Sequence, residues 1–321
     1  MAHSTTNTEH LIRSDIWSGQ LKELFEDELF ATRYISWLDG FPDGELFHIP
    51  SIGQAEAQDY EEGQAVTYST LDTGEFLFRI TEYVQSGHFI TNKMKQDSFY
   101  MSQLVSSFVP KEHRALMKRL EVDALRIGVD RQTAGDYNAI NGVAHRWVGT
   151  GPGNSISVED FARARLALQK ANVPMTDLVA VVDPSVEFSF NTLANVTNVI
   201  NNPTWQGIIR DSFGTGMQFR ANVYGFDVYV SQNLKQNISE TIPGGGQSVT
   251  NGVANLFFSA ASGAQPFVGA IRQAPKVDSK YNMDLQREEY VTTMRYGLDL
   301  FRPENFISVI TDNTITAPSY S

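Results

Sequence analysis

Two pairs of adjacent carboxylates have the chemistry of a general acid and a general base, and they occur at Glu61–Glu62 and Glu288–Glu289. An acid and a base that cooperate must reach the same substrate, whereas adjacent residues of a strand point to opposite faces of the sheet. Both pairs are therefore interpreted as solvated or intersubunit charges. We predict no catalytic residue from them.

Metal ligands and nucleophiles are also poorly placed in this sequence. The six histidines are scattered, without an HExxH motif or a pair at metal-ligand spacing, and they lie at positions 3, 10, 48, 88, 113 and 145. The chain has no cysteine, which excludes disulfides, thiolate nucleophiles and cysteine-ligated metals. A GxSxG motif is absent as well, although a triad assembled from distant segments stays open as an alternative. We expect no metal site.

Two glycine-rich stretches resemble nucleotide-binding loops only in composition. Residues 244–248 lack the lysine of a P-loop. Residues 149–153 lack GxGxxG spacing, and their Pro152 favours a turn over the start of a helix. We therefore expect surface loops at both places and no cofactor.

The overall charge limits the classes of partner. The formal net charge is −12 and the pI is about 4.9, because 37 acidic residues outnumber 25 basic ones. A protein that grips nucleic acid needs clustered Lys and Arg to neutralise phosphates, so any contact with DNA is predicted to be weak and non-specific. No export signal and no stretch of roughly 18 apolar residues is visible, which predicts a soluble protein without membrane contact.

A strongly acidic segment spans residues 41–90. It holds nine acidic residues but only one basic residue, Arg79, and no lysine. Apolar residues alternate from Phe76 to Ile80 and again at Val66 and Tyr68, which predicts an extended β-hairpin. Because its middle is polar, the hairpin cannot bury a core alone and should lie on another surface, such as a second copy of the chain. The acidic residues singled out as contacts are Asp59, Glu61 and Glu62.

Two helical patterns follow the acidic segment. Apolar residues recur at helical spacing from Asp97 to Val109, and Pro110 then suits the first position of a second helix that ends at Gly128. This predicted spine helix, 110–127, spans roughly 27 Å at 1.5 Å per residue. Its basic group consists of Lys111, Arg114, Lys118, Arg119 and Arg126. The group is interpreted as a nucleic-acid contact, a partner for the acidic hairpin or a solvated helix face.

An α/β-type layer is predicted after a glycine-rich boundary at residues 141–155. Ser157 and Asp160 form a capping-box pattern for a helix that runs to about Ala171, and an apolar strand follows at residues 178–184. Further elements are expected at residues 184–200 (helix), on both sides of Gly225 (strands), and within 240–263, 267–284 and 289–301 (strands).

The stretch MRYGLDLFRPENFISVI, at residues 294–310, is a strand pattern interrupted by Arg302, Pro303 and Glu304. From residue 290 to 300 the even positions are mostly apolar, which predicts a strand covered on one side by core. Pro303 cannot donate to a β-ladder, so the chain must turn before a last strand at 306–310. Arg302 and Glu304 are expected in inter-domain or intersubunit ion pairs.

The order of these parts resembles the major capsid proteins of tailed bacteriophages, which have the Hong Kong 97-type fold. The closest marks are REEYVTTMRYGLDLFRPENFISVI at 287–310 and VYGFDVYVSQNL at 223–234. The resemblance implies an α+β protein with an N-terminal arm, an extended β-hairpin loop, a peripheral domain with a long spine helix, and an axial α/β domain. The implied bounds are 1–40 for the arm, 41–90 for the loop, 91–150 with 267–292 for the peripheral domain, and 151–266 with 293–321 for the axial domain.

The same resemblance implies a structural protein of the virion and not an enzyme. Its copies would assemble in the host cytoplasm, through pentamers and hexamers, into an icosahedral or prolate shell around the viral DNA. The implied partners are a separate scaffolding protein, a portal protein and a decoration or cement protein. Some members link a lysine of the extended loop covalently to a neighbour, but this loop has no lysine, so no such link is expected.

Two alternatives stay open from the sequence. An encapsulin-type compartment shell shares the fold but encloses an enzyme. A cytosolic hydrolase would gather its carboxylates in a concave pocket with shifted pKa values, whereas a shell protein would form a flat, L-shaped plate with unsatisfied edges.

Overall fold

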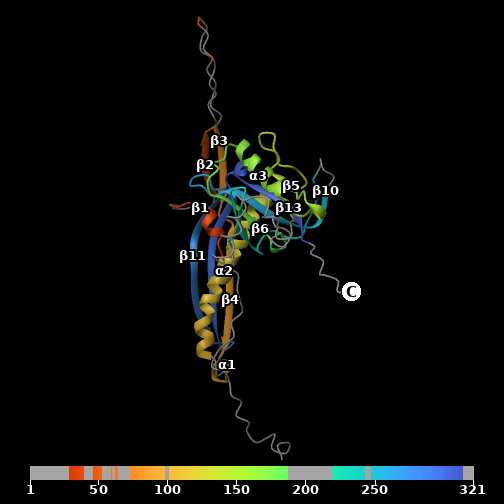
Figure 1. Ribbon diagram of the computed structural model, residues 1–321. Coiled ribbons are helices and arrows are strands. Elements are labelled where there is room, and N and C mark those ends of the chain that lie inside the picture. The colour runs from red at the N-terminus through yellow and green to blue at the C-terminus, as the bar shows by residue number, and fades with distance from the viewer. Residues whose placement is uncertain are drawn as a thin grey trace, which may run out of the picture.

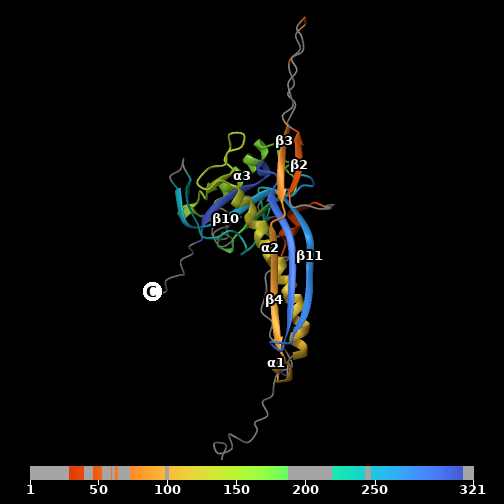
Figure 2. The same cartoon turned by 180° about the vertical axis from the view of Figure 1, so that it is seen from behind.

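The computed structural model describes residues 29–39, 46–52, 59, 62–63, 73–97, 101–186, 219–242 and 247–313. These residues form a long, narrow part, with a compact part beside its upper half (Figure 1; Figure 2 shows the opposite side). We name the narrow part the stem and the compact part the block. Together they give the molecule the L-shaped outline that a shell protein predicts.

A four-stranded sheet forms the stem. Its order is β1 (Ile35–Trp37), β11 (Phe267–Asn282), β12 (Arg287–Leu300) and β4 (Glu82–Thr91). β11, β12 and β4 are antiparallel, whereas β1 is parallel to β11 and follows the short 3₁₀ helix η1 (Ala31–Tyr34). Helix α2 (Met101–Arg131) lies along one face of this sheet, and α1 (Asn92–Asp97) lies at its far end.

The alternation predicted for β12 is confirmed over residues 291–296, whereas every residue from Tyr296 to Leu300 is buried. Thr292, Met294 and Tyr296 are fully buried on the side of the sheet that α2 covers, while Thr293 and Arg295 between them are only partly buried. Successive side chains of a strand point to opposite faces, so one helix can cover every second residue. β12 runs through residue 292 without a break.

Helix α2 is longer than the predicted spine helix at both ends. It begins at Met101 instead of Pro110, which lies inside it, and it continues past Gly128 to Arg131. Proline inside a helix removes one backbone hydrogen bond, but a helix held against a sheet over most of its length can tolerate that loss. Gly128 lies inside α2, and a side chain does not fit there because a Cβ atom would lie 2.5 Å from Cζ of Phe306.

The acidic segment contains a hairpin. β2 (Leu46–Ile52) pairs antiparallel with β3 (Thr73–Arg79), whereas residues 82–90, predicted in the same loop, belong to β4 of the stem. Phe78 and Ile80 are buried against Val268 and Ala270 of β11, so the base of the hairpin packs on the stem. The predicted strand around Val66 and Tyr68 lies outside the described residues.

A mixed seven-stranded sheet forms the block. Its order is β5 (Arg146–Val148), β13 (Ile307–Asp312), β10 (Gln247–Ser259), β6 (Leu178–Val182), β8 (Phe226–Val230) and β7 (Phe219–Val223), with β9 (Ile238–Ile242) also paired to β10. Helix α3 (Val158–Lys170) covers one face, and its predicted capping box is present. The helix predicted at 184–200 lies mostly outside the described residues.

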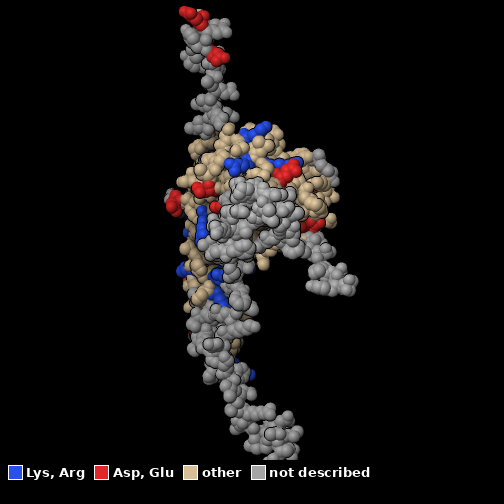
Figure 3. Space-filling view, in the orientation of Figure 1, with Lys and Arg blue, Asp and Glu red and all other residues tan. Residues whose placement is uncertain are grey.

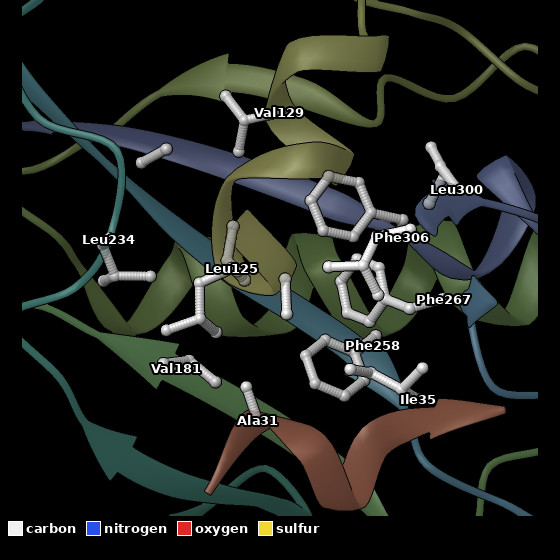
Figure 4. Packing of buried hydrophobic residues seen from close by; sticks show 14 of the residues in the cluster. Ala31, Ile35, Leu125, Val129, Val181, Leu234, Phe258, Phe267, Leu300 and Phe306 are labelled. Carbon is white, nitrogen blue, oxygen red and sulfur yellow. The ribbon is translucent and has the colours of Figure 1, made fainter. Parts of the chain in front are cut away.

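The other face of the block sheet packs on the stem, and the two parts share one core. Leu125 and Val129 of α2 belong to the same buried cluster as Val181 of β6, Phe258 of β10 and Phe267 of β11 (Figure 4). The 3₁₀ helix η5 (Pro303–Asn305) carries the chain from β12 in the stem to β13 in the block. At the predicted turn, Pro303, the chain therefore passes from the sheet of the stem to the sheet of the block.

Candidate functional site: assembly surfaces and the joint behind them

The acidic residues predicted as contacts lie in the chain between β2 and β3. Asp59 and Glu62 are exposed, and Glu61 lies outside the described residues. Arg79, the one base of the segment, is exposed at the end of β3. Carboxylates in water cost nothing to keep charged, so this segment can offer negative charge to another molecule.

The basic group of α2 lies on the stem and is not brought to the acidic hairpin. Lys111 and Lys118 are exposed and Arg114 is partly buried, while Arg119 donates to Asp123 across one helical turn at 3.0 Å. β2 and β3 lie at the opposite end of the molecule from α1, where α2 begins (Figures 1 and 2). Figure 3 shows Lys and Arg side chains along the stem below the level of the block. Contact between the two groups would need a second chain.

The corner residues form a local ion pair. Arg302 Nη1 lies 3.7 Å from Glu304 Oε1, and both side chains are about 40% exposed, at 42% and 38%. The guanidinium of Arg302 also lies over the ring of Phe301. The expected pairing of these residues across subunits stays a prediction, because the described chain pairs them with each other.

Three polar contacts fix the position of α2 on β12. Thr292 donates to Glu112 at 2.5 Å, and the Tyr296 hydroxyl donates to Asp123 at 2.6 Å. Arg131 donates two hydrogen bonds to Asp299, at 2.6 and 2.8 Å. Burial raises the pKa of Tyr296, and its bond to the Asp123 carboxylate raises it further. Each contact requires one helix residue opposite one strand residue, so together they disfavour sliding of the helix along the sheet.

Replacing Tyr296 by Phe is expected to lower the free energy of unfolding by about 1–2 kcal/mol, because a hydrogen bond to a charged group is lost. The matched control is Tyr290→Phe in the same strand, whose hydroxyl donates to the partly exposed Glu288. That change should cost about 0.5 kcal/mol or less. Urea denaturation of both variants measures the difference, and equal costs would contradict a special role for the Tyr296 contact.

A buried ion pair links three strands of the block to the end of α2. Arg146 donates two hydrogen bonds to Glu240, at 3.1 and 3.0 Å, and both side chains are almost fully buried. Arg146 also donates to Gln132 at the end of α2 and to Ser308 of β13. Sequence reasoning missed this pair, although an arginine next to Trp147 and Val148 in an apolar strand was a signal for it.

A second buried carboxylate holds the segment that precedes the stem sheet. Glu121 of α2 accepts hydrogen bonds from the backbone N–H groups of Phe30 and Ala31, at 3.2 and 2.8 Å. Burial raises the pKa of Glu121, while the two N–H groups act in the opposite direction. The chain leading into β1 is thereby fixed to the helix that carries the exposed lysines.

Metal-binding clusters and membrane-spanning helices are absent from the described residues. No group of three or more His, Asp or Glu side chains in them is placed to bind a metal ion. No helix in the described ranges combines the length and the apolar character needed to cross a membrane.

Comparison with known proteins shows to which family the chain belongs. Residues 93–309 match the model of a family described as phage capsid protein, which is more than half of the 321 residues. The chain belongs to the phage capsid protein family. No curated protein sequence matches it. The predicted function is confirmed: the chain is a phage major capsid protein, whose copies self-assemble into a shell and which is located in the virion.

Solved structures confirm the Hong Kong 97-type fold of this capsid protein. A chain from Mycobacterium phage Che8 is 15% identical, covering 94% of this chain and 97% of that chain at a TM-score of 0.66. The capsid structure of cyanophage P-SCSP1u gives 16% identity, 96% and 94% coverage, and a TM-score of 0.67. The capsid of Ralstonia phage GP4 is 11% identical, covering 95% of this chain and 97% of that chain at a TM-score of 0.66. The family match favours a phage capsid over both the encapsulin and the hydrolase.

Proposed function

We propose that this capsid protein builds an icosahedral or prolate shell of pentamers and hexamers around the viral DNA, and that its acidic hairpin lies on a neighbouring subunit. The observation that supports the second part is the separation, within one chain, of the acidic segment from the basic group of α2. Opposite charges that lie apart within one subunit can attract each other between subunits. Each contact is weak, and many of them in a closed shell give a large avidity.

Each part of the fold has its own role in the proposed shell. We assign the stem to the peripheral domain and the block to the axial domain, with residues 1–40 as the arm and the segment around β2 and β3 as the extended loop. Rings of five and six require the same surfaces to meet at slightly different angles, which rigid elements with adjustable connections allow. The polar contacts between α2 and β12 support a rigid stem.

The remaining partners follow from the proposed shell. Assembly in the host cytoplasm would use a separate scaffolding protein and a portal protein, with a decoration or cement protein on the finished shell. The net charge of −12 supports only weak, non-specific contact with packaged DNA. No catalytic step is proposed, and the absence of lysine from residues 41–90 argues against a covalent link through that loop.

The charge of the hairpin provides the test. Replacing Glu61 and Glu62 by Lys is expected to reduce the yield of closed particles at least about tenfold, because attraction to a basic surface becomes repulsion. Replacement of both by Gln should give an intermediate yield. Particles are counted by negative-stain microscopy and sedimentation after co-expression with the scaffolding protein.

Two controls separate assembly from folding. The isolated variant subunits should keep the thermal unfolding midpoint of the wild type, because an exposed charge such as Glu62 contributes little to stability. Normal particles from the Lys variant would contradict the role of the hairpin. Wild-type protein that forms no closed particle under any of these conditions would contradict the proposed shell itself.

A further inference from the structure

A fully buried histidine lies at the joint between the stem and the block. Nδ1 of His145 lies 3.0 Å from the carbonyl oxygen of Val143. A carbonyl oxygen only accepts hydrogen bonds, so Nδ1 must carry the proton. In a neutral imidazole the other nitrogen, Nε2, then has a bare lone pair.

Nε2 of His145 is buried and has no hydrogen-bond partner. The backbone and the carboxylate of Glu304 on η5 both favour a proton on the ring. A neutral histidine that donates from Nδ1 to Val143 has no proton on Nε2 to donate to Glu304. Burial nevertheless outweighs these contacts, so the pKa of His145 lies below its usual value.

The backbone of the same residue connects the parts that meet at the joint. The His145 carbonyl accepts from the Ser308 N–H of β13 at 3.0 Å and from the Gln132 amide at the end of α2 at 3.1 Å. Its own N–H donates to Tyr137 at 2.9 Å. A displacement of this residue would thus loosen contacts to the stem, to the corner and to the block together.

The charged groups around the joint are already engaged. Arg146 is bonded to Glu240, and Arg131 at the end of α2 is bonded to Asp299. Arg302 Nη1 lies 3.7 Å from Glu304 Oε1 at η5. Among the described residues, Glu304 is the carboxylate whose charge raises the pKa of His145. A positive charge on the imidazole would therefore lack a dedicated counter-charge.

We propose that His145 makes the joint between stem and block sensitive to acid. A proton taken from solvent by Nε2 gives a buried imidazolium, and hydration of that ion separates the corner at Arg302–Glu304 from the start of β5. The stabilising contribution of neutral His145 is complete above the pKa of an unfolded histidine, about 6.5, and is lost as the pH falls through the lower pKa of the folded state.

Amide hydrogen exchange of the full chain, read by mass spectrometry, tests this proposal against the variant His145→Asn. The Asn amide can still donate to Val143 but does not titrate. After correction for the intrinsic rate, exchange in residues 143–149 and 304–310 should be about tenfold faster at pH 5 than at pH 7 in the wild type, and change less than about twofold in His145→Asn. Helix α3 is the internal control. Equal acid sensitivity in both proteins would overturn the proposal.

A measurement on the wild type keeps the proposal testable if the variant does not fold. Nitrogen-15 NMR of labelled histidines should show His145 with its proton on Nδ1 at neutral pH and a titration midpoint below about 6.5. Substituting the other five histidines one at a time identifies its signal. A proton on Nε2 at neutral pH, or a midpoint at or above that of a free histidine, would overturn the assignment.

Discussion

Replacing Arg146 by Ala should lower the free energy of unfolding of the isolated subunit by about 3–5 kcal/mol, because it leaves the buried carboxylate of Glu240 without its partner. Glu240 is only 6% exposed and accepts both guanidinium hydrogen bonds, at 3.1 and 3.0 Å. The same change also removes donors to Gln132 and Ser308. Guanidinium chloride denaturation of the subunit, followed by circular dichroism, measures the loss.

Two further variants show whether the loss comes from an uncompensated buried charge. The exposed pair of Arg163 and Glu159 on α3 is the control, and Arg163→Ala should cost no more than about 1 kcal/mol. The double variant Arg146→Met with Glu240→Leu should be more stable than Arg146→Ala, because no charge is then left buried. An Arg146→Ala subunit within about 1 kcal/mol of the wild type would contradict a buried pair of this kind.

The elements that the sequence predicted correctly are those whose signals are local. The Ser157 and Asp160 capping box marks the start of α3 because both partners lie within one helical turn. The alternation from residue 290 to 300 gives β12 and its covered face because a strand has a period of two. The corner at Pro303 was predictable because proline cannot donate to a ladder.

The errors concern contacts between residues far apart in the sequence. Pro110 has the local preference of a helix start, but it lies inside α2, which begins at Met101. The partner of β3 is β2, more than 20 residues upstream, and no local pattern specifies such a pairing. Arg146 and Glu240 are separated by 94 residues, so their ion pair depends on how β5 and β9 come together.

The assembly surfaces were the least predictable part of the protein. Lys111 and Glu62 are exposed, and folding of one chain does not require a partner for such charges. Their role in assembly therefore depends on other copies of the chain. Sequence could identify the acidic segment and the basic group. It could not show that β2 and β3 lie at one end of the subunit while α2 runs along the stem away from them, which is the observation that favours contact between subunits (Figure 1).

Replacing Gly128 by Ala in α2 is expected to destabilise the subunit by about 1–3 kcal/mol through overpacking. In an ordinary helix the same change would stabilise by roughly 0.5–1 kcal/mol, because alanine is the better helix former. Here the new Cβ would lie 2.5 Å from Cζ and 2.6 Å from Cε2 of Phe306. The ring cannot swing away, because Phe306 is fully buried and packs edge-on against Phe267 at 5.6 Å between centroids.

A double-mutant cycle with Phe306→Leu tests whether the Phe306 ring causes the loss of stability in Gly128→Ala. Leucine lacks the ring atoms that would meet the new Cβ, so Gly128→Ala should be neutral or stabilising in the Phe306→Leu background. The coupling energy between the two positions should then be about 1–3 kcal/mol, as for residues in direct contact. A Gly128→Ala subunit more stable than the wild type would show that α2 and the corner are not packed this tightly. The stem and block could then move at their joint more freely than the shared core implies.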